Sequence, residues 1–264
     1  MQRLTQRWGR PVALGLSLLI LAFGGWIAAY RWGAVERAGY VGVDFRWFVA
    51  YAQRWLDTGS MYLPLQISGP YSPTDLGHPA VAMYPPNALY LFAPFLVLPA
   101  ILWWAIPLGI IGYALWRWRP APWTWPILAL FLVIPDTYTP VMTGNVTMWA
   151  VALVAAGLLW GWPGVLIALK PSLLPFALVG IRHRSWWIAA VAMGVLALPL
   201  WSAWGDYVAV LRNAEMGATY LSPAFVLASL PAMLLPVVAW AGRRRENGTA
   251  RSEGGVWTRR QAVA

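Results

Sequence analysis

PVALGLSLLILAFGGWIAAY, residues 11–30, decides the fold, because no side chain in this stretch is ionised at neutral pH. A helix needs about 20 such residues to cross the ~30 Å hydrocarbon layer of a bilayer. Arg3, Arg7 and Arg10 precede the stretch, as basic residues precede a signal peptide. The apolar core of a signal peptide has only about 7–15 residues, however. We therefore expect an uncleaved membrane anchor.

The composition of the chain also indicates that the bilayer is its solvent. Of 264 residues, 60% are hydrophobic and 11% are charged, whereas about a quarter are charged in an ordinary soluble domain. The formal charge of +10 is divided among short clusters at the ends of apolar runs, which membrane topology explains and nucleic-acid binding does not. The lack of cysteine excludes disulfides, Cys-ligated zinc, iron–sulfur clusters and cysteine nucleophiles.

Further apolar runs cover residues 84–98, 100–116, 123–135, 146–160, 163–179, 186–204 and 223–241. The positive-inside rule places Arg117 and Arg119 on the inner side only if two of these runs do not cross. Residues 84–98 would dip in from outside and return, and residues 163–179 would form two half-helices that meet near Lys170 and Pro171. The expected fold is an all-α, polytopic transmembrane bundle with short re-entrant half-helices.

This topology divides the chain into a membrane domain, residues 1–242, and a basic tail, residues 243–264. Residues 31–83 form a long extracytoplasmic loop, and the tail is expected to be cytoplasmic and disordered. The inner side then holds thirteen of the nineteen basic residues, and the outer side seven of the nine acidic ones. We expect a multi-pass protein of the bacterial plasma membrane with both termini in the cytoplasm.

The outer loop carries the first candidate site. Residues 44–58 show helical spacing, with Phe48, Ala52 and Trp55 along one stripe, which predicts an amphipathic helix on the membrane surface. Asp44 stands at its start and Tyr51 lies within it. A carboxylate beside aromatic surface is suited to act as a general base on a sugar hydroxyl. Asp is also a preferred N-cap residue, so capping of this helix is the alternative.

Lys170 is the only lysine and interrupts an apolar run. Its ammonium costs about 2.5–3.5 kcal/mol in a membrane segment by insertion scales, so we expect it to face a cavity or an anionic partner. A clamp for a lipid-linked phosphate is one interpretation. A lysine that extends its ammonium to the interface is the other.

Weaker candidates are residues that turn chemistry, helix capping or surface exposure also explains. The chain shows no Gly-rich phosphate loop, no His-Glu-x-x-His helix and no serine elbow. The weaker candidates for substrate binding are His78, Tyr84, Asn145, Arg46 and Arg212.

Four short motifs resemble the polyprenyl-phosphate-mannose-dependent glycosyltransferases of family 87, which have the GT-C fold. They are DFRWFVAYAQRWLDTGSMY at residues 44–62, Tyr84-Pro85-Pro86, Gly144-Asn145 and Ala168-Leu169-Lys170-Pro171. Their order is that of the family. They lie within residues 10–185, and the family commonly has Gln where Asn145 stands. Family members usually continue through several more membrane helices, which makes a truncated or non-catalytic member an alternative.

The resemblance implies that Asp44 is the catalytic carboxylate and that Lys170 lies near the donor phosphate. The function expected is transfer of a sugar, mannose in the family, from a polyprenyl phosphate to a lipid or glycan acceptor at the extracytoplasmic face of the membrane. Membrane lipids are the other expected partners. Such a transfer needs no cofactor, with a divalent metal ion left open. The rival from another class is a transporter or flippase of lipid-linked or anionic substrates, with broken helices along its pathway.

Overall fold

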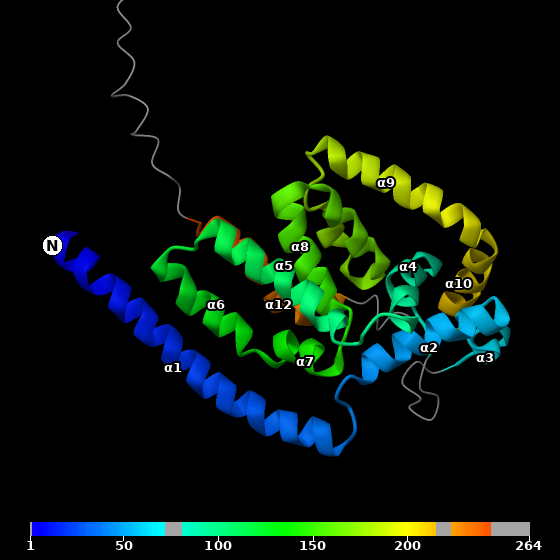
Figure 1. The fold of residues 1–264 in the computed structure, drawn as a ribbon, viewed down its shortest axis with the longest axis horizontal. Coiled ribbons are helices and arrows are strands. Elements are labelled where there is room, and N and C mark those ends of the chain that lie inside the picture. The colour runs from blue at the N-terminus through cyan, green and yellow to red at the C-terminus, as the bar shows by residue number, and fades with distance from the viewer. Residues whose placement is uncertain (1, 72–80, 215–222, 244–264) are drawn as a thin grey trace, which may run out of the picture.

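The computed structural model describes residues 2–71, 81–214 and 223–243. It is 81% helical and, over these residues, contains no strand, so the predicted all-α class is confirmed. Figure 1 shows the long helix α1 along one side of the molecule and α2, α3 and α10 gathered at the end away from the N-terminus. The helices α5, α8 and α12 lie between them.

Two helices of the described chain are long and apolar enough to cross a membrane. One is the part Gly9–Arg37 of α1 (Gln2–Arg37), 29 residues, and the other is Arg184–Asn213, 30 residues. At 1.5 Å per residue each reaches about 44 Å, more than the ~30 Å of hydrocarbon. A third span arises if α6 and α7 count as one helix bent by 64°. These spans indicate a membrane protein.

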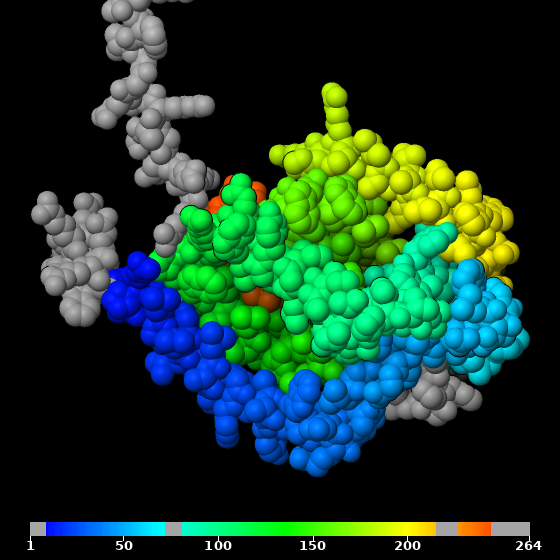
Figure 2. Space-filling view, viewed as in Figure 1, coloured from blue at the N-terminus to red at the C-terminus, as the bar shows by residue number. Residues whose placement is uncertain are grey.

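The candidate spans expose their apolar side chains instead of burying them. Leu19 and Trp26 of α1 are each 70% exposed, as is Ile188 of α9. Figure 2 shows α1 and the α9–α10 segment at opposite edges of the body. Apolar surface of this extent is what a lipid-facing helix presents, because a soluble monomer rarely exposes it.

The remaining elements are shorter. The second candidate span consists of α9 (Arg184–Ala197), η6 (Leu198–Leu200) and α10 (Trp201–Asn213). The other α-helices are α2 (Val43–Thr58), α3 (Pro64–Ser68), α4 (Leu89–Phe92), α5 (Leu102–Trp118), α6 (Trp125–Leu132), α7 (Pro135–Thr143), α8 (Thr147–Trp160) and α12 (Pro223–Ala241). Short 3₁₀ helices are η1 (Pro86–Ala88), η2 (Ala93–Leu96), η3 (Pro122–Thr124), η4 (Trp162–Leu169) and η5 (Pro171–Leu178).

Helix α8 is the centre of the packing. Ten of its residues are buried, from Thr147 to Gly157, and it contacts α5, α12 and η4. The sequence explains this position, since TMWAVALVAAGLLW is apolar on every side and small on several. A helix that is apolar all round is buried by its neighbours.

The helix predicted over residues 44–58 is confirmed by α2, which buries Phe48, Tyr51 and Ala52. Phe48 stacks on Phe92 of α4 with ring centroids 4.7 Å apart. The preceding helix α1 extends to Arg37, beyond the apolar run that ends at Tyr30, and stops where Gly39 takes a left-handed conformation with φ 72°. The turn that follows brings the chain back onto the body, where α2 begins.

The predicted break in residues 163–179 is also present. Two helical pieces, η4 and η5, flank Lys170, whose own backbone is extended. They are 3₁₀ helices, as Pro163, Pro171 and Pro175 interrupt regular α-helical hydrogen bonding. Residues 84–98 likewise form three short pieces, η1, α4 and η2, which pack on α2 and one another.

Gly164 holds η4 against the end of η5, because a Cβ at this position would collide with the Val179 carbonyl oxygen. We predict that Gly164→Ala lowers the free energy of unfolding by roughly 1–3 kcal/mol, since the backbone must move apart. Denaturation of the purified protein in detergent measures this. Gly112→Ala on α5, where a Cβ has open space, is the control and should be neutral or stabilising. Equal melting of the two variants would contradict the close approach.

Candidate functional site

Asp44 lies in the first turn of α2, near the end of α7. Gly42, in a left-handed conformation, is the N-cap of α2, and its N–H donates to the Met142 carbonyl at 2.9 Å. Asp44 is therefore not the N-cap residue that the capping alternative requires. Its half-buried carboxylate instead accepts hydrogen bonds on Oδ2 from Thr143 Oγ1 at 2.6 Å and Asn145 Nδ2 at 2.9 Å.

A tight turn between α7 and α8 presents these two donors. Gly144 ends α7 with φ 74°, and a Cβ there would lie 2.9 Å from Phe45 Cβ. Two indoles fix the turn: Trp103 Nε1 donates to the Gly144 carbonyl at 2.7 Å and Trp104 Nε1 to the Val141 carbonyl at 2.8 Å. Only glycine suits this position, because it combines a left-handed conformation with close packing.

Asn145 lies two residues before the start of α8. Its Oδ1 accepts hydrogen bonds from the Thr147 N–H at 2.9 Å and the Thr147 hydroxyl at 2.7 Å. This is the way in which an asparagine satisfies an open N–H group at a helix N-terminus. The two ends of the Asn145 amide thus have different partners. Its Oδ1 accepts hydrogen bonds at the start of α8, and its Nδ2 donates to Asp44.

Lys170 completes the arrangement from the break between η4 and η5. Its side chain is only 7% exposed, and Nζ donates to Asn145 Oδ1 at 2.9 Å and to Thr147 Oγ1 at 2.5 Å. A buried ammonium is costly unless hydrogen bonds and a counter-charge compensate it. The carboxylate of Asp44, one amide group away, supplies the counter-charge.

We call Asp44, Thr143, Asn145, Thr147 and Lys170 the polar network. It joins α2, the α7–α8 turn and the η4–η5 break, which the chain separates by as many as 126 positions between residues 44 and 170. Both hydrogen bonds to Asp44 go to Oδ2, and Oδ1 accepts none from the described part of the chain. An oxygen held in this way can accept a proton from a bound molecule.

The structure places the other predicted residues apart from the network. Tyr51 is buried and donates to the Val81 carbonyl at 3.1 Å, and the Tyr84 ring packs edge-on against Phe48. The Arg46 guanidinium donates to the Val41 and Gly39 carbonyls at 2.7 and 2.8 Å and so braces the turn before α2. Arg212 is exposed in the last turn of α10.

His78 lies in residues 72–80, outside the described residues. The sequence did not single out Thr143 and Thr147 as site residues, although both contact ionised groups in the structure. The available signal was TGNVT, residues 143–147, a polar interruption between apolar segments. Over the described ranges, no group of three His, Asp or Glu side chains could hold a metal ion.

Neither protein-family models, nor curated proteins, nor solved structures gave a match to this chain. The resemblance to family 87 is therefore carried by the short motifs alone.

Asn145 should be the residue on which the network depends. Asn145→Leu removes the amide that joins Asp44 to Lys170 and leaves a buried ammonium with fewer acceptors. We expect it to lower the free energy of unfolding by roughly 2–4 kcal/mol, against about 1 kcal/mol for Thr143→Val, which removes one donor to Asp44. Chemical denaturation in detergent compares the two. If Thr143→Val costs as much as Asn145→Leu, Asn145 has no special place in the network.

Proposed function

We propose that this chain transfers a sugar from a polyprenyl phosphate to an acceptor hydroxyl at the outer membrane face, with mannose as the sugar suggested by the family resemblance. The observation that carries the proposal is the juxtaposition of Asp44 and Lys170 through Asn145. A transfer of this kind needs a base for the acceptor and a cation for the leaving phosphate on either side of one anomeric carbon. A carboxylate and an ammonium joined by one amide supply these two groups close to each other.

In the proposed reaction, Asp44 Oδ1 takes the proton of the acceptor hydroxyl while the acceptor oxygen bonds to the anomeric carbon. The bond between that carbon and the phosphate oxygen breaks, and polyprenyl phosphate leaves with the electron pair. Lys170 stabilises the negative charge that develops on the phosphate. Thr143 and Asn145, by donating to Oδ2, hold the carboxylate in one orientation.

The fold proposed for this function is a polytopic GT-C-like bundle with the polar network on the extracytoplasmic side. The distribution of charge supports this orientation. Arg117, Arg119 and Arg243 gather where Pro120 pairs with Arg243, at the far end of α8 from Asn145. The positive-inside rule then puts the network outside. A lipid-linked donor suits the site because the α1 and α9 helices keep the chain in the bilayer.

Asp44→Asn should abolish transfer while the protein stays folded. The amide keeps the shape of the carboxylate but does not accept the proton, and a general base contributes about 10²–10⁴-fold to rate. Incubation of purified protein with labelled polyprenyl phosphate mannose and lipid acceptors measures the rate. Asp57→Asn, an exposed carboxylate on the same helix bonded to Gln53, should retain wild-type transfer. Wild-type rates from Asp44→Asn would remove Asp44 from the mechanism.

Lys170→Met should weaken the binding of polyprenyl phosphate mannose more than the binding of the acceptor, because it removes the positive charge and keeps the length of the side chain. Loss of one charge-assisted contact corresponds to about tenfold in affinity. Kd values for donor and acceptor, measured separately on the detergent-solubilised protein, test this. Thr147→Val, which removes a hydrogen-bond partner of Lys170 but keeps its charge, is the matched control.

Equal weakening of donor and acceptor binding by Lys170→Met would argue against a phosphate clamp. Movement of intact polyprenyl phosphate mannose across a vesicle membrane, with no transfer to any acceptor, would instead favour a flippase, in which the broken η4–η5 segment lines a pathway.

A further inference from the structure

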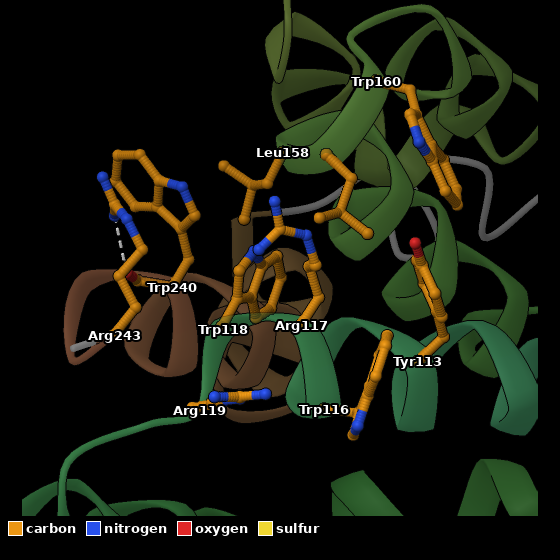
Figure 3. Close-up of a pocket in the computed structure, with 10 residues that line it drawn as sticks. Tyr113, Trp116, Arg117, Trp118, Arg119, Leu158, Trp160, Trp240 and Arg243 are labelled. Carbon is orange, nitrogen blue, oxygen red and sulfur yellow. Dashed lines mark hydrogen bonds between the residues drawn. The ribbon is translucent and has the colours of Figure 1, made fainter. Parts of the chain in front are cut away.

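A second polar feature lies at the opposite end of α8 from Asn145. Helices α5, α8 and α12 border an open pocket of about 830 Å³ there, within the ~300–1,000 Å³ typical of ligand sites. Figure 3 shows its walls. The lining residues are Tyr113, Trp116, Arg117, Trp118, Arg119, Leu158, Leu159, Trp160, Trp240 and Arg243. We call it the basic pocket.

The charges of the basic pocket have one sign. Three arginines line it, and none of the described lining residues is acidic. Arg243 is held in place, since Nη1 donates to the Trp240 carbonyl at 2.7 Å and the guanidinium carbon lies 4.1 Å from the centroid of the Trp240 ring. Arg117 and Arg119 are exposed, and no hydrogen bond joins either guanidinium to a described residue. Within the described ranges, most of these guanidinium donors thus have no acceptor.

The backbone of Arg119 is a second, independent observation. Arg119 ends α5 with φ 47°, the only positive φ outside glycine among the described residues. A helix of this kind ordinarily ends in glycine or asparagine, which adopt the left-handed conformation without strain. Strained residues that persist are concentrated at functional sites. Because of this backbone conformation, the arginine side chain stands at the end of α5, where it lines the pocket.

The aromatic side chains indicate where the pocket lies in a membrane. Tyr113 and Trp160 stack with ring centroids 5.9 Å apart, and Trp116 and Trp160 are exposed. Figure 3 shows the Tyr113–Trp160 pair and the Trp240–Arg243 pair on either side of Arg117 in that view. Exposed indoles and arginines at the ends of membrane helices mark the headgroup level of the bilayer.

We propose that the basic pocket binds the phosphate diester headgroup of an anionic phospholipid from the surrounding bilayer. Arg117, Arg119 and Arg243 donate to the phosphate oxygens, for which the guanidinium fork is suited. The exposed aromatic rings of Trp116 and Trp160 contact the glycerol and the upper acyl chains. The pocket is a lipid site that holds this end of the bundle at the headgroups, and it does not depend on the proposed transfer reaction.

The test uses the full chain, purified in detergent and stripped of lipid, with phosphatidylglycerol and phosphatidylcholine of identical acyl chains as probes. Native mass spectrometry measures the retention of each. R117Q/R119Q/R243Q should bind phosphatidylglycerol at least about tenfold more weakly than wild type, the loss that corresponds to a single charge-assisted contact. R10Q/R182Q/R184Q removes the same number of exposed charges outside the pocket and should bind as wild type does.

Arg119→Gly is a second variant, in which loss of binding cannot be due to a failure to fold. Glycine adopts the positive φ of this position without strain. The variant should melt at or above the wild-type temperature and still bind phosphatidylglycerol more weakly. Equal retention of the two lipids by wild type, or equal loss in the two triple variants, would overturn the proposal. Competition by soluble glycerol phosphate as strong as by phosphatidylglycerol would also overturn it, because the site would then be one for a free phosphate ester.

Discussion

The burial of one ammonium group is the constraint on which the rest of the structure depends. Lys170 sits in an apolar part of the chain, where an unpaired charge costs several kcal/mol. Its partners come from a turn 25 residues earlier and, through Asn145, from helix α2. Three segments must therefore meet at one point, and their meeting fixes where α2 enters the body. The ammonium organises the fold as much as any apolar contact does.

Glycine and proline make this meeting possible. Pro171 ends η4 and leaves Lys170 extended, while Gly144, in a left-handed conformation, starts the three-residue turn from α7 into α8. Gly42, also left-handed, ends the turn between α1 and α2, and its N–H donates to the Met142 carbonyl in α7. Each break frees backbone or side-chain groups that a continuous helix would hide. The side chains of the polar network lie at these breaks or in the helical turns next to them.

The sequence predicted the parts of the site that depend on local pattern. The amphipathic spacing of residues 44–58 and the proline after Lys170 were sufficient for α2 and for the break. The Asn145 bridge was not predictable in this way, since hydrogen bonds between residues 44, 145 and 170 depend on the packing of α8, and Asn145 and Thr147 by themselves indicate only a turn. The basic pocket was not predictable from the sequence for a similar reason, because Arg117 and Arg243 come together only when α5 and α12 pack on α8. The close packing of η4 on α8 was also not predictable, because it depends on Gly157 and Gly164 carrying no side chain where the two elements meet.

The length of α8 relates the two features to each other. Its 14 residues span about 21 Å, less than the ~30 Å of hydrocarbon. If the basic pocket lies among the headgroups of one leaflet, Asn145 lies below the headgroups of the other, and any tilt of α8 lowers it further. A polar network at that depth must satisfy its own charges, as Asp44 and Lys170 do. It also meets a lipid-borne phosphate more readily than a soluble one, because a polyprenyl chain brings its phosphate to the edge of the hydrocarbon. For the proposed transfer, this depth suits a lipid-linked donor better than a nucleotide sugar.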